Sequence, residues 1–175
     1  MTAKKTQAKT PTWVKCSHSK MEDPAKLVPN PRNPNRHPTN QVALLAKILE
    51  FQGWRLPVVV SRLSGFVVRG HGRLLAARVL GLDLVPVDYQ DYESEAQEWA
   101  DLVADNRIAE LSEMDSQDLK DIIEELDTGE LDLDLTGFDQ EDLASLMSQV
   151  HVQDGENDDQ GEGITCPECG HQWTP

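Results

Sequence analysis

A turn that holds two glycines, a histidine and an arginine contains the residues best suited to chemistry in this sequence. In VVRGHGRLLAAR an expected strand ends, Gly70, His71 and Gly72 follow, and Arg73 falls in the first turn of an expected helix. Glycines let the backbone approach a phosphate closely, and the free N–H groups of a helix start attract an anion. Arg73 can donate a bidentate pair of hydrogen bonds, and His71 can add a donor. The pattern predicts an anion site, with an ordinary tight turn and a surface arginine as the alternative.

Two cysteines near the C-terminus form a second candidate site. Cys166 and Cys169 lie in CPECGH, which has the spacing of a zinc knuckle, and a tetrahedral zinc site needs two further ligands. Cys16 and His18, near the other end of the chain, could supply them, and His171 could replace His18. We expect the two chain ends to close the zinc site. The alternatives are a site shared between two chains and a knuckle that holds no metal.

Regular elements on both sides must position the glycine turn. Two β-branched segments, roughly 57–62 and 66–69, are joined by a short turn, which predicts a β-hairpin directly before the glycines. The helix that follows should stop near Gly81, before a strand at 84–87. The hairpin and this helix would therefore hold the turn between them.

A stiff loop and another helix precede the hairpin. Segment 27–40 contains four prolines and four asparagines, a density that excludes a helix or a central strand. Asn40 then caps a helix whose apolar residues recur at helical spacing, and Gly53 ends it.

The second half of the chain is predicted to be helical and acidic. One helix should carry an apolar stripe formed by Ala96, Trp99, Ala100, Val103, Ile108 and Leu111. Two more helices are expected over 116–126 and, capped by Asp139, over 140–150.

Charge divides the 175 residues into two opposite halves. Residues 1–80 contain 14 Lys and Arg against 3 Asp and Glu, whereas residues 81–175 contain 2 against 28. The basic half can attract the phosphate of a nucleotide or a nucleic acid. The acidic half repels DNA and suits either a protein partner or a solvated surface. With a net charge of −15, the whole chain is expected to be a poor nonspecific DNA binder.

Length and composition exclude other classes of protein. The chain can form one domain of about 100 to 150 residues with tails, which excludes most large catalytic folds. No run approaches 18 consecutive apolar residues, and no apolar stretch follows the basic N-terminal residues. We therefore expect a soluble cytoplasmic protein without a membrane partner.

Taken together, these motifs resemble a known family. NPRNPN at 30–35, the hairpin, GHGRLLAAR and the following LGL and VPV resemble the ParB-like N-terminal domain of the ParB/sulfiredoxin fold, over about 27–111. The resemblance implies an α+β core with a small mixed sheet and flanking helices. The expected organisation is a flexible arm (1–25), this ParB/sulfiredoxin-like core (26–92), an acidic helical region (93–150), a disordered linker (151–163) and a zinc-knuckle tail (164–175).

The family's first two boxes imply a site for a nucleoside triphosphate. In the first box Asn30 and Asn33 match the family pattern, and Arg36 stands beside Asn35, which occupies the place of the family's arginine. In the second box Gly70 and Arg73 match, whereas His71 and Gly72 replace a glutamate and an arginine of the family. The resemblance implies that these residues surround the nucleotide.

The third box implies magnesium ligands. Asp105 and Asn106, within ADNRIAEL, correspond to the acidic residue and asparagine that ligate magnesium in the family. A carboxylate and an amide oxygen suit this ion. The alternative is that both residues lie on a solvated helix face.

The resemblance implies a ParB-like protein that binds nucleotide and magnesium and acts in a DNA transaction, with hydrolysis of the nucleotide left open. The sequence also looks like phage and prophage ParB-like proteins of the kind often found beside, or fused to, DNA methyltransferases, which implies a place in the cytoplasm of a bacterial host. An alternative is a noncatalytic adaptor whose basic half contacts DNA or a methyltransferase and whose acidic helices bind a protein or mimic DNA. Whether the protein forms a homodimer is left open. ParB-like nuclease activity is a third alternative, although no clustered His, Asp and Glu motif supports it.

Overall fold

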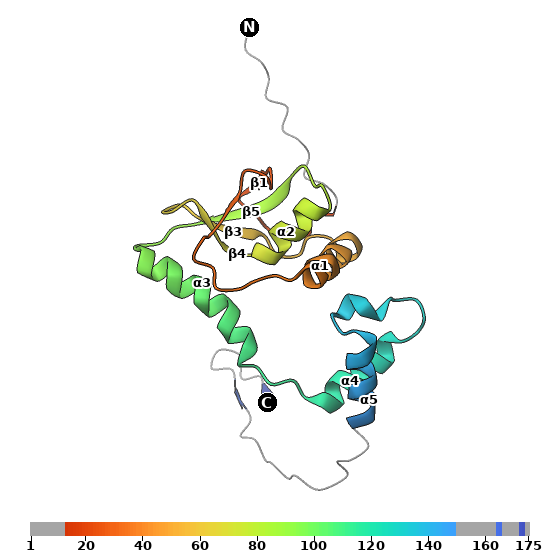
Figure 1. Ribbon diagram of the computed structural model, residues 1–175. Coiled ribbons are helices and arrows are strands. Elements are labelled where there is room, and N and C mark those ends of the chain that lie inside the picture. Colours follow the sequence, from red (N-terminus) through yellow and green to blue (C-terminus); the bar gives the residue numbers. More distant parts are fainter. Residues whose placement is uncertain (1–12, 150–163, 166–171, 174–175) are drawn as a thin grey trace.

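A five-stranded mixed sheet forms the centre of the protein, whose computed structural model describes residues 13–149, 164–165 and 172–173 (Figure 1). Its strands are β1 (Lys20–Glu22), β2 (Val28–Pro29), β3 (Val58–Ser61), β4 (Phe66–Arg69) and β5 (Val85–Gln90), in the order β1-β5-β3-β4-β2. β3 runs parallel to β5 and antiparallel to β4, and the short outer strands pair with β5 and β4. The predicted small mixed sheet is therefore confirmed.

Two helices, α1 (Thr39–Gln52) and α2 (His71–Val79), pack against each other and close the core (Figure 1). Their buried apolar residues are Val42, Ala46 and Leu49 on α1 and Leu74, Ala76 and Ala77 on α2. The alanines let the two helices approach closely, and valines of the central strands fill the space beneath them.

The hairpin and the glycine turn stand where the sequence places them, with one correction. β3 and β4 form the expected hairpin, but the glycines do not all lie outside regular structure. Only Gly70 adopts a left-handed conformation, with a φ of 87°, and α2 already begins at His71. A single residue with positive φ is enough to turn the chain from strand to helix, and glycine adopts it at little cost. Gly72 is therefore helical.

The bounds of α1 differ from the prediction at one end. Asn40 was expected to cap the helix, but the cap position is Pro38, and no side chain accepts a hydrogen bond there. The fixed φ of proline suits a helix start, so the helix begins earlier than the asparagine signal indicates. The predicted end is confirmed, because Gly53 follows the helix with a φ of 74°.

Residues 13–25, predicted as part of a flexible arm, are held against the core in the structure. β1 pairs with β5, and the backbones of Trp13 and Lys15 exchange hydrogen bonds of 2.8 Å with Trp54. Trp13 and Cys16 also pack against the core. These contacts come from a three-residue edge strand and from an isolated bridge between Val14 and Trp54, which are too short to leave a hydrophobic period in the sequence.

Helix α3 (Glu95–Glu110) begins at a Ser94 cap but does not bury the expected apolar stripe. Its buried residues are Glu98 and Leu102. Of the stripe, Trp99 is half-buried, whereas Ala96, Ala100, Val103, Ile108 and Leu111 are exposed. The helix packs on the core through a narrow face that is held mainly by polar contacts. The spacing of its apolar residues therefore indicated the wrong face of the helix as the buried one.

The acidic region after α3 contains α4 (Ser116–Leu126), the short 3-10 helix η1 (Leu133–Thr136) and α5 (Gln140–Gln149), which we call the annex. It buries Ile123, Leu135 and Leu146. The Asp139 carboxylate accepts hydrogen bonds from the start of α5, as predicted. None of the helices in the described residues is long and apolar enough to cross a membrane.

A last pair of strands, β6 (Ile164–Thr165) and β7 (Gln172–Trp173), is antiparallel. The predicted zinc ligands Cys166 and Cys169, and the alternative ligand His171, lie outside the described residues.

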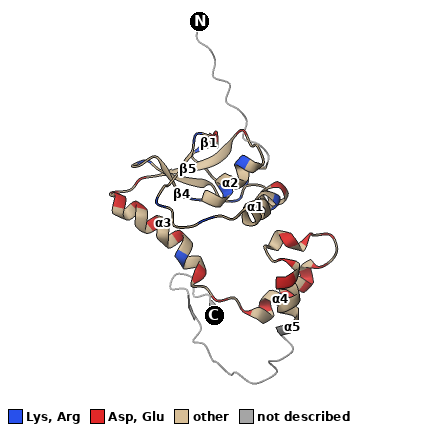
Figure 2. Ribbon diagram, in the orientation of Figure 1, with Lys and Arg blue, Asp and Glu red and all other residues tan. Residues whose placement is uncertain are grey.

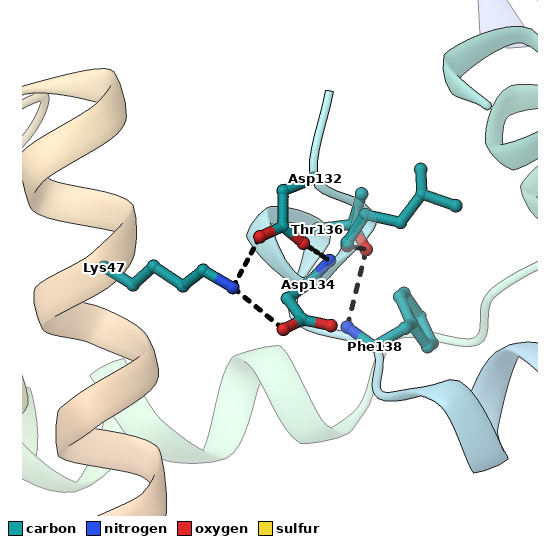
Figure 3. Close-up of polar contacts among 6 residues, drawn as sticks. Lys47, Asp132, Asp134, Thr136 and Phe138 are labelled. Atoms are coloured by element: carbon teal, nitrogen blue, oxygen red, sulfur yellow. Dashed lines mark hydrogen bonds and ion pairs between the residues drawn. The ribbon is translucent and has the colours of Figure 1, made fainter. Parts of the chain in front are cut away.

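One lysine on α1 binds the annex to the core. Acidic residues are concentrated on the annex helices (Figure 2). Lys47 Nζ lies 2.6 Å from Asp132 Oδ2 and 2.8 Å from Asp134 Oδ2 (Figure 3). The other oxygen of Asp132 accepts a hydrogen bond from the Asp134 N–H and so caps η1. The turn therefore presents two carboxylates to one cation, and all three side chains are open to solvent.

Replacing Lys47 should loosen the annex. Lys47→Ala removes both ion pairs, and small-angle scattering at low salt should then show a larger radius of gyration than in the wild type. High salt should expand the wild-type protein similarly, because the screening length falls from about 30 Å at 0.01 M to about 3 Å at 1 M. Lys20→Ala, which removes an ion pair with Glu22 on β1, is the control. Identical scattering of Lys47→Ala and wild type at low salt would contradict the prediction.

Candidate functional site

The start of α2, the loop before α1 and helix α3 surround a cavity of about 180 Å³. Its lining consists of Asn33, His37, Leu45, Val68, Gly70, His71, Gly72, Arg73, Asp105 and Asn106. A second cavity of about 200 Å³ shares Asn33, His37 and His71 with the first. It adds Pro29, Asn30, Asn35 and Leu75. Three segments that are distant in sequence thus meet here.

Most of the residues predicted for nucleotide and magnesium line these cavities. Asn33, Gly70, His71, Gly72, Arg73, Asp105 and Asn106 belong to the first cavity, and Asn30 belongs to the second. Arg36 is exposed and lines neither of them. The three boxes therefore converge in space, apart from this arginine.

Arg73 is the cation of the first cavity. Its guanidinium is largely buried, and its Nε has no hydrogen-bond partner among the protein groups that the structure describes. Burial lowers the pKa of Arg73, and the nearby Asp105 carboxylate opposes this effect. A Cβ atom at position 70 would lie 3.3 Å from Arg73 Nη2, so the glycine leaves room for the guanidinium. Such a buried cation with an unused donor is suited to binding an anion.

His71, which is predicted to add a donor at the anion site, makes contacts within the protein. Its Nε2 accepts a hydrogen bond of 3.3 Å from the backbone N–H of Asn30, and the ring also bonds to the backbone of Val67. Burial, reinforced by the nearby His37, lowers the pKa of His71 to about 4. The ring is therefore neutral at pH 7, and it connects α2 to the loop.

Gly72 serves packing as well as backbone approach. A Cβ atom at this position would lie 2.9 Å from Leu45 Cδ1 and 3.3 Å from two ring atoms of His37. His37 is in turn held by Gln41, whose Oε1 lies 2.9 Å from His37 Nδ1. A side chain at position 72 would thus displace the loop and α1 from the cavity.

Asn30 is predicted to line the pocket, and it also connects the segments around it. It is 5% exposed. Its Nδ2 donates to Glu98 Oε1 at 3.3 Å, and its Oδ1 accepts the N–H of Arg32 at 2.9 Å. Its backbone oxygen accepts the N–H of Asn33, and its own N–H donates to His71. Its polar groups are thus engaged within the protein.

The two predicted magnesium ligands already have protein contacts. Asp105 Oδ1 lies 3.3 Å from Arg69 Nη1, and Asn106 Nδ2 donates to the Leu102 carbonyl at 3.0 Å. The Asn106 amide oxygen and the other Asp105 oxygen have the chemistry that magnesium prefers. Within the described residues, no group of three or more His, Cys, Asp and Glu side chains could hold a metal ion together. The magnesium site stays a prediction.

A polar network that the sequence analysis missed anchors α3 to the sheet. The Arg69 guanidinium donates two hydrogen bonds to the Asp101 carboxylate, and Tyr92 Oη donates to the same carboxylate at 2.8 Å. The Arg69 hydrogen bond lowers the pKa of Asp101, whereas burial raises that of Tyr92. Arg32 lies 3.9 Å from the centre of the Trp99 ring, a cation–π contact between the loop and α3. The sequence signal that could have indicated a role for Arg69 is its position directly before Gly70.

The described half of the predicted zinc site is close to the core. Cys16 is partly buried, and this burial raises the pKa of its thiol. His18 Nδ1 lies 3.0 Å from the Cys16 carbonyl oxygen. The other predicted ligands are not among the described residues, so the zinc site stays a prediction.

His71 should make stability depend on pH. An unfolded histidine has a pKa of about 6.5, so between pH 6.5 and 4 the unfolded chain binds a proton that the folded chain excludes. The stabilisation is complete above this window and is lost as the pH falls through it. It amounts to about 3 kcal/mol at most. Urea unfolding at pH 7 and pH 4 should show a larger loss for wild type than for His71→Gln, and equal losses would contradict this assignment.

Comparisons with known proteins bear on the fold and the family of the chain. No family model matches the chain. The ParB-like nuclease domain-containing protein YnaK of Escherichia coli strain K12 is 40% identical over 62 residues, which make up 35% of this chain and 70% of that protein. C-terminally truncated chromosome-partitioning protein ParB from Caulobacter crescentus, complexed with CTP-gamma-S, has a TM-score of 0.60 at 18% identity, covering 77% of this chain and 79% of that one. The structural likeness shows the fold, and the sequence identity shows that the chain belongs to the ParB-like family.

Proposed function

We propose that the chain binds a nucleoside triphosphate in the cavity between the start of α2 and α3, with the phosphates against Arg73. The observation that carries the proposal is the buried Arg73 guanidinium, whose Nε has no partner in the described protein. A desolvated cation without a bound anion is costly, and a phosphate would supply the missing acceptor. The same cavity contains the glycine turn, so a ligand there would contact both.

The start of α2 adds uncharged donors to this cation. The first intrahelical bond of α2 runs from the Leu74 N–H to the Gly70 carbonyl, so the N–H groups of residues 71–73 precede the regular ladder. The positive end of the helix dipole points in the same direction. Together with Arg73, these donors favour a polyphosphate over a neutral ligand.

Magnesium would be held from the opposite wall by Asp105 and Asn106. Both line the same cavity as Arg73. Asp105 Oδ1 forms an ion pair with Arg69 Nη1 at 3.3 Å, so a metal ion would compete with that arginine for this carboxylate oxygen. Bound magnesium would neutralise phosphate charge. We assign no residue to hydrolysis.

Two relatives support a nucleotide and a DNA transaction. The ParB of Caulobacter crescentus is complexed with CTP-gamma-S, and the Escherichia coli protein is named for a ParB-like nuclease domain. The excess of Lys and Arg in residues 1–80 suits a nucleic acid partner. A methyltransferase-associated adaptor is the second candidate, favoured by the annex, in which residues 111–149 contain 13 Asp and Glu against one Lys.

Arg73→Ala should weaken nucleotide binding. Loss of a charge-assisted contact of about 1.5 to 3 kcal/mol corresponds to a roughly ten- to hundredfold weaker affinity. Isothermal titration of the wild type and of Arg73→Ala with each of the four NTPs and magnesium measures this difference in affinity. Arg55→Ala is the matched control, because Arg55 is exposed and, among the described residues, donates only to the Gln52 carbonyl.

Three outcomes separate the candidates. Absence of wild-type binding at millimolar nucleotide would contradict the nucleotide proposal, and so would equal affinities of Arg73→Ala and wild type. A variant that loses nucleotide but still captures the wild type's protein or DNA partner would favour the adaptor.

We also propose one zinc ion, bound by Cys166 and Cys169 and completed by Cys16 and His18. The pairing of β6 with β7 supports the proposal, because these strands flank the segment that contains Cys166 and Cys169. Thiolates favour zinc over magnesium or calcium.

Elemental analysis should then find about one zinc per chain, because four ligands complete one tetrahedral site. Cys16→Ser should lower this content. A Cys16→Ser monomer with full zinc would show that another residue, such as His171, completes the site.

A further inference from the structure

Glu98 is an unusual residue to find at the docking face of α3. It is 1% exposed, although apolar residues of the same helix such as Val103 and Ile108 face solvent. Its Oε1 accepts hydrogen bonds from Ser64 Oγ at 2.8 Å and from Asn30 Nδ2 at 3.3 Å. One carboxylate oxygen thus joins α3 to the β3–β4 turn and to the loop before α1.

The contact continues to the start of α2. Asn30, which donates to Glu98 through its side chain, donates to His71 Nε2 through its backbone N–H. His71 is followed within two residues by Arg73. Glu98 therefore connects α3 with the turn that presents the guanidinium, through two hydrogen bonds of 3.3 Å each.

The opposite wall of the cavity lies on the same helix, which Arg69 also holds through Asp101 and Asp105. Asp105 and Asn106 line the cavity, seven and eight residues after Glu98. At 1.5 Å per residue they lie roughly 10 to 12 Å further along the helix. Most residues of α3 after Leu102 are exposed. A small rotation of α3 about Glu98 would therefore displace Asp105 and Asn106 relative to Arg73.

The second carboxylate oxygen indicates that stability alone does not explain this side chain. Glu98 Oε2 is buried and has no hydrogen-bond partner among the described protein groups. An unpaired buried acceptor is unfavourable, and an apolar side chain of similar size would avoid that cost. The benefit of the glutamate has to be sought in the contacts of Oε1.

We propose that Glu98 is a positioning residue of the nucleotide site, which sets the distance between the Arg73 side and the Asp105 side of the cavity through Asn30. The inference rests on the proposed nucleotide function. It assigns no contact between Glu98 and the ligand.

Three variants test the role of Oε1. Glu98→Met fills a similar volume but accepts no hydrogen bond, and Glu98→Gln keeps an acceptor oxygen. Glu95→Met changes an exposed acidic residue of the same helix and is the control. Circular dichroism establishes that each variant is folded before it is compared.

Three measurements are made on each variant. Residual dipolar couplings of the α3 amides report the orientation of the helix relative to the sheet, and exchange of the Asn30 and Arg32 amide hydrogens reports the loop. Isothermal titration with NTP and magnesium reports affinity. We expect Glu98→Met to reorient α3, to accelerate exchange at least tenfold and to weaken nucleotide binding at least fivefold. Glu98→Gln should restore all three, and Glu95→Met should change none.

The outcomes keep the two proposals apart. If the wild type binds no nucleotide, the proposed function fails, while the couplings and exchange still decide whether Glu98 positions α3. If Glu98→Met leaves the couplings and exchange unchanged, the inference is wrong, whatever the affinity. If α3 moves but nucleotide affinity stays at the wild-type value, Glu98 is structural only, and the positioning role is also overturned.

Discussion

Asn30 holds together the three segments around the candidate site, and the arrangement of that region depends on it. Its side-chain amide donates to Glu98 on α3, and its backbone N–H donates to His71 at the start of α2. Its two oxygens accept from the N–H groups of Arg32 and Asn33 within its own loop. Because the residue is buried, each of these groups would be costly to leave unpaired. The loop and the two helices therefore keep their relative positions as one unit.

Two arginines four residues apart, Arg69 and Arg73, differ in burial and in ion pairing, and this difference gives them different roles at the site. Arg69 is paired with Asp101 and Asp105, so its charge is used to attach α3 to the sheet. Arg73 is more deeply buried, which lowers its pKa. The Asp105 carboxylate opposes this lowering but forms no ion pair with Arg73 within 4 Å. The first arginine is thus satisfied by the protein, whereas the second retains a donor for something else. The Asp105 carboxylate favours the charged form of both arginines.

The predictable parts of the structure are those whose signals are local. Helix α4 has its predicted bounds, 116–126, because its apolar spacing and flanking residues lie within one segment. The hairpin and the turn at Gly70 follow from β-branched runs and from glycine conformation in the same way. The role of His71 could not be predicted, because its partner Asn30 lies 41 residues earlier. The docking face of α3 was missed because Glu98 is buried through hydrogen bonds, which hydropathy does not register.

The two outer strands of the main sheet have a consequence for how copies of this chain can meet. β1 has three residues and begins with Lys20, and β2 has two, of which Pro29 lacks an N–H. Short edges that carry lysine or proline offer few backbone groups to an incoming strand. The sheet is thus protected against growth at either border, which guards against fibrillar aggregation.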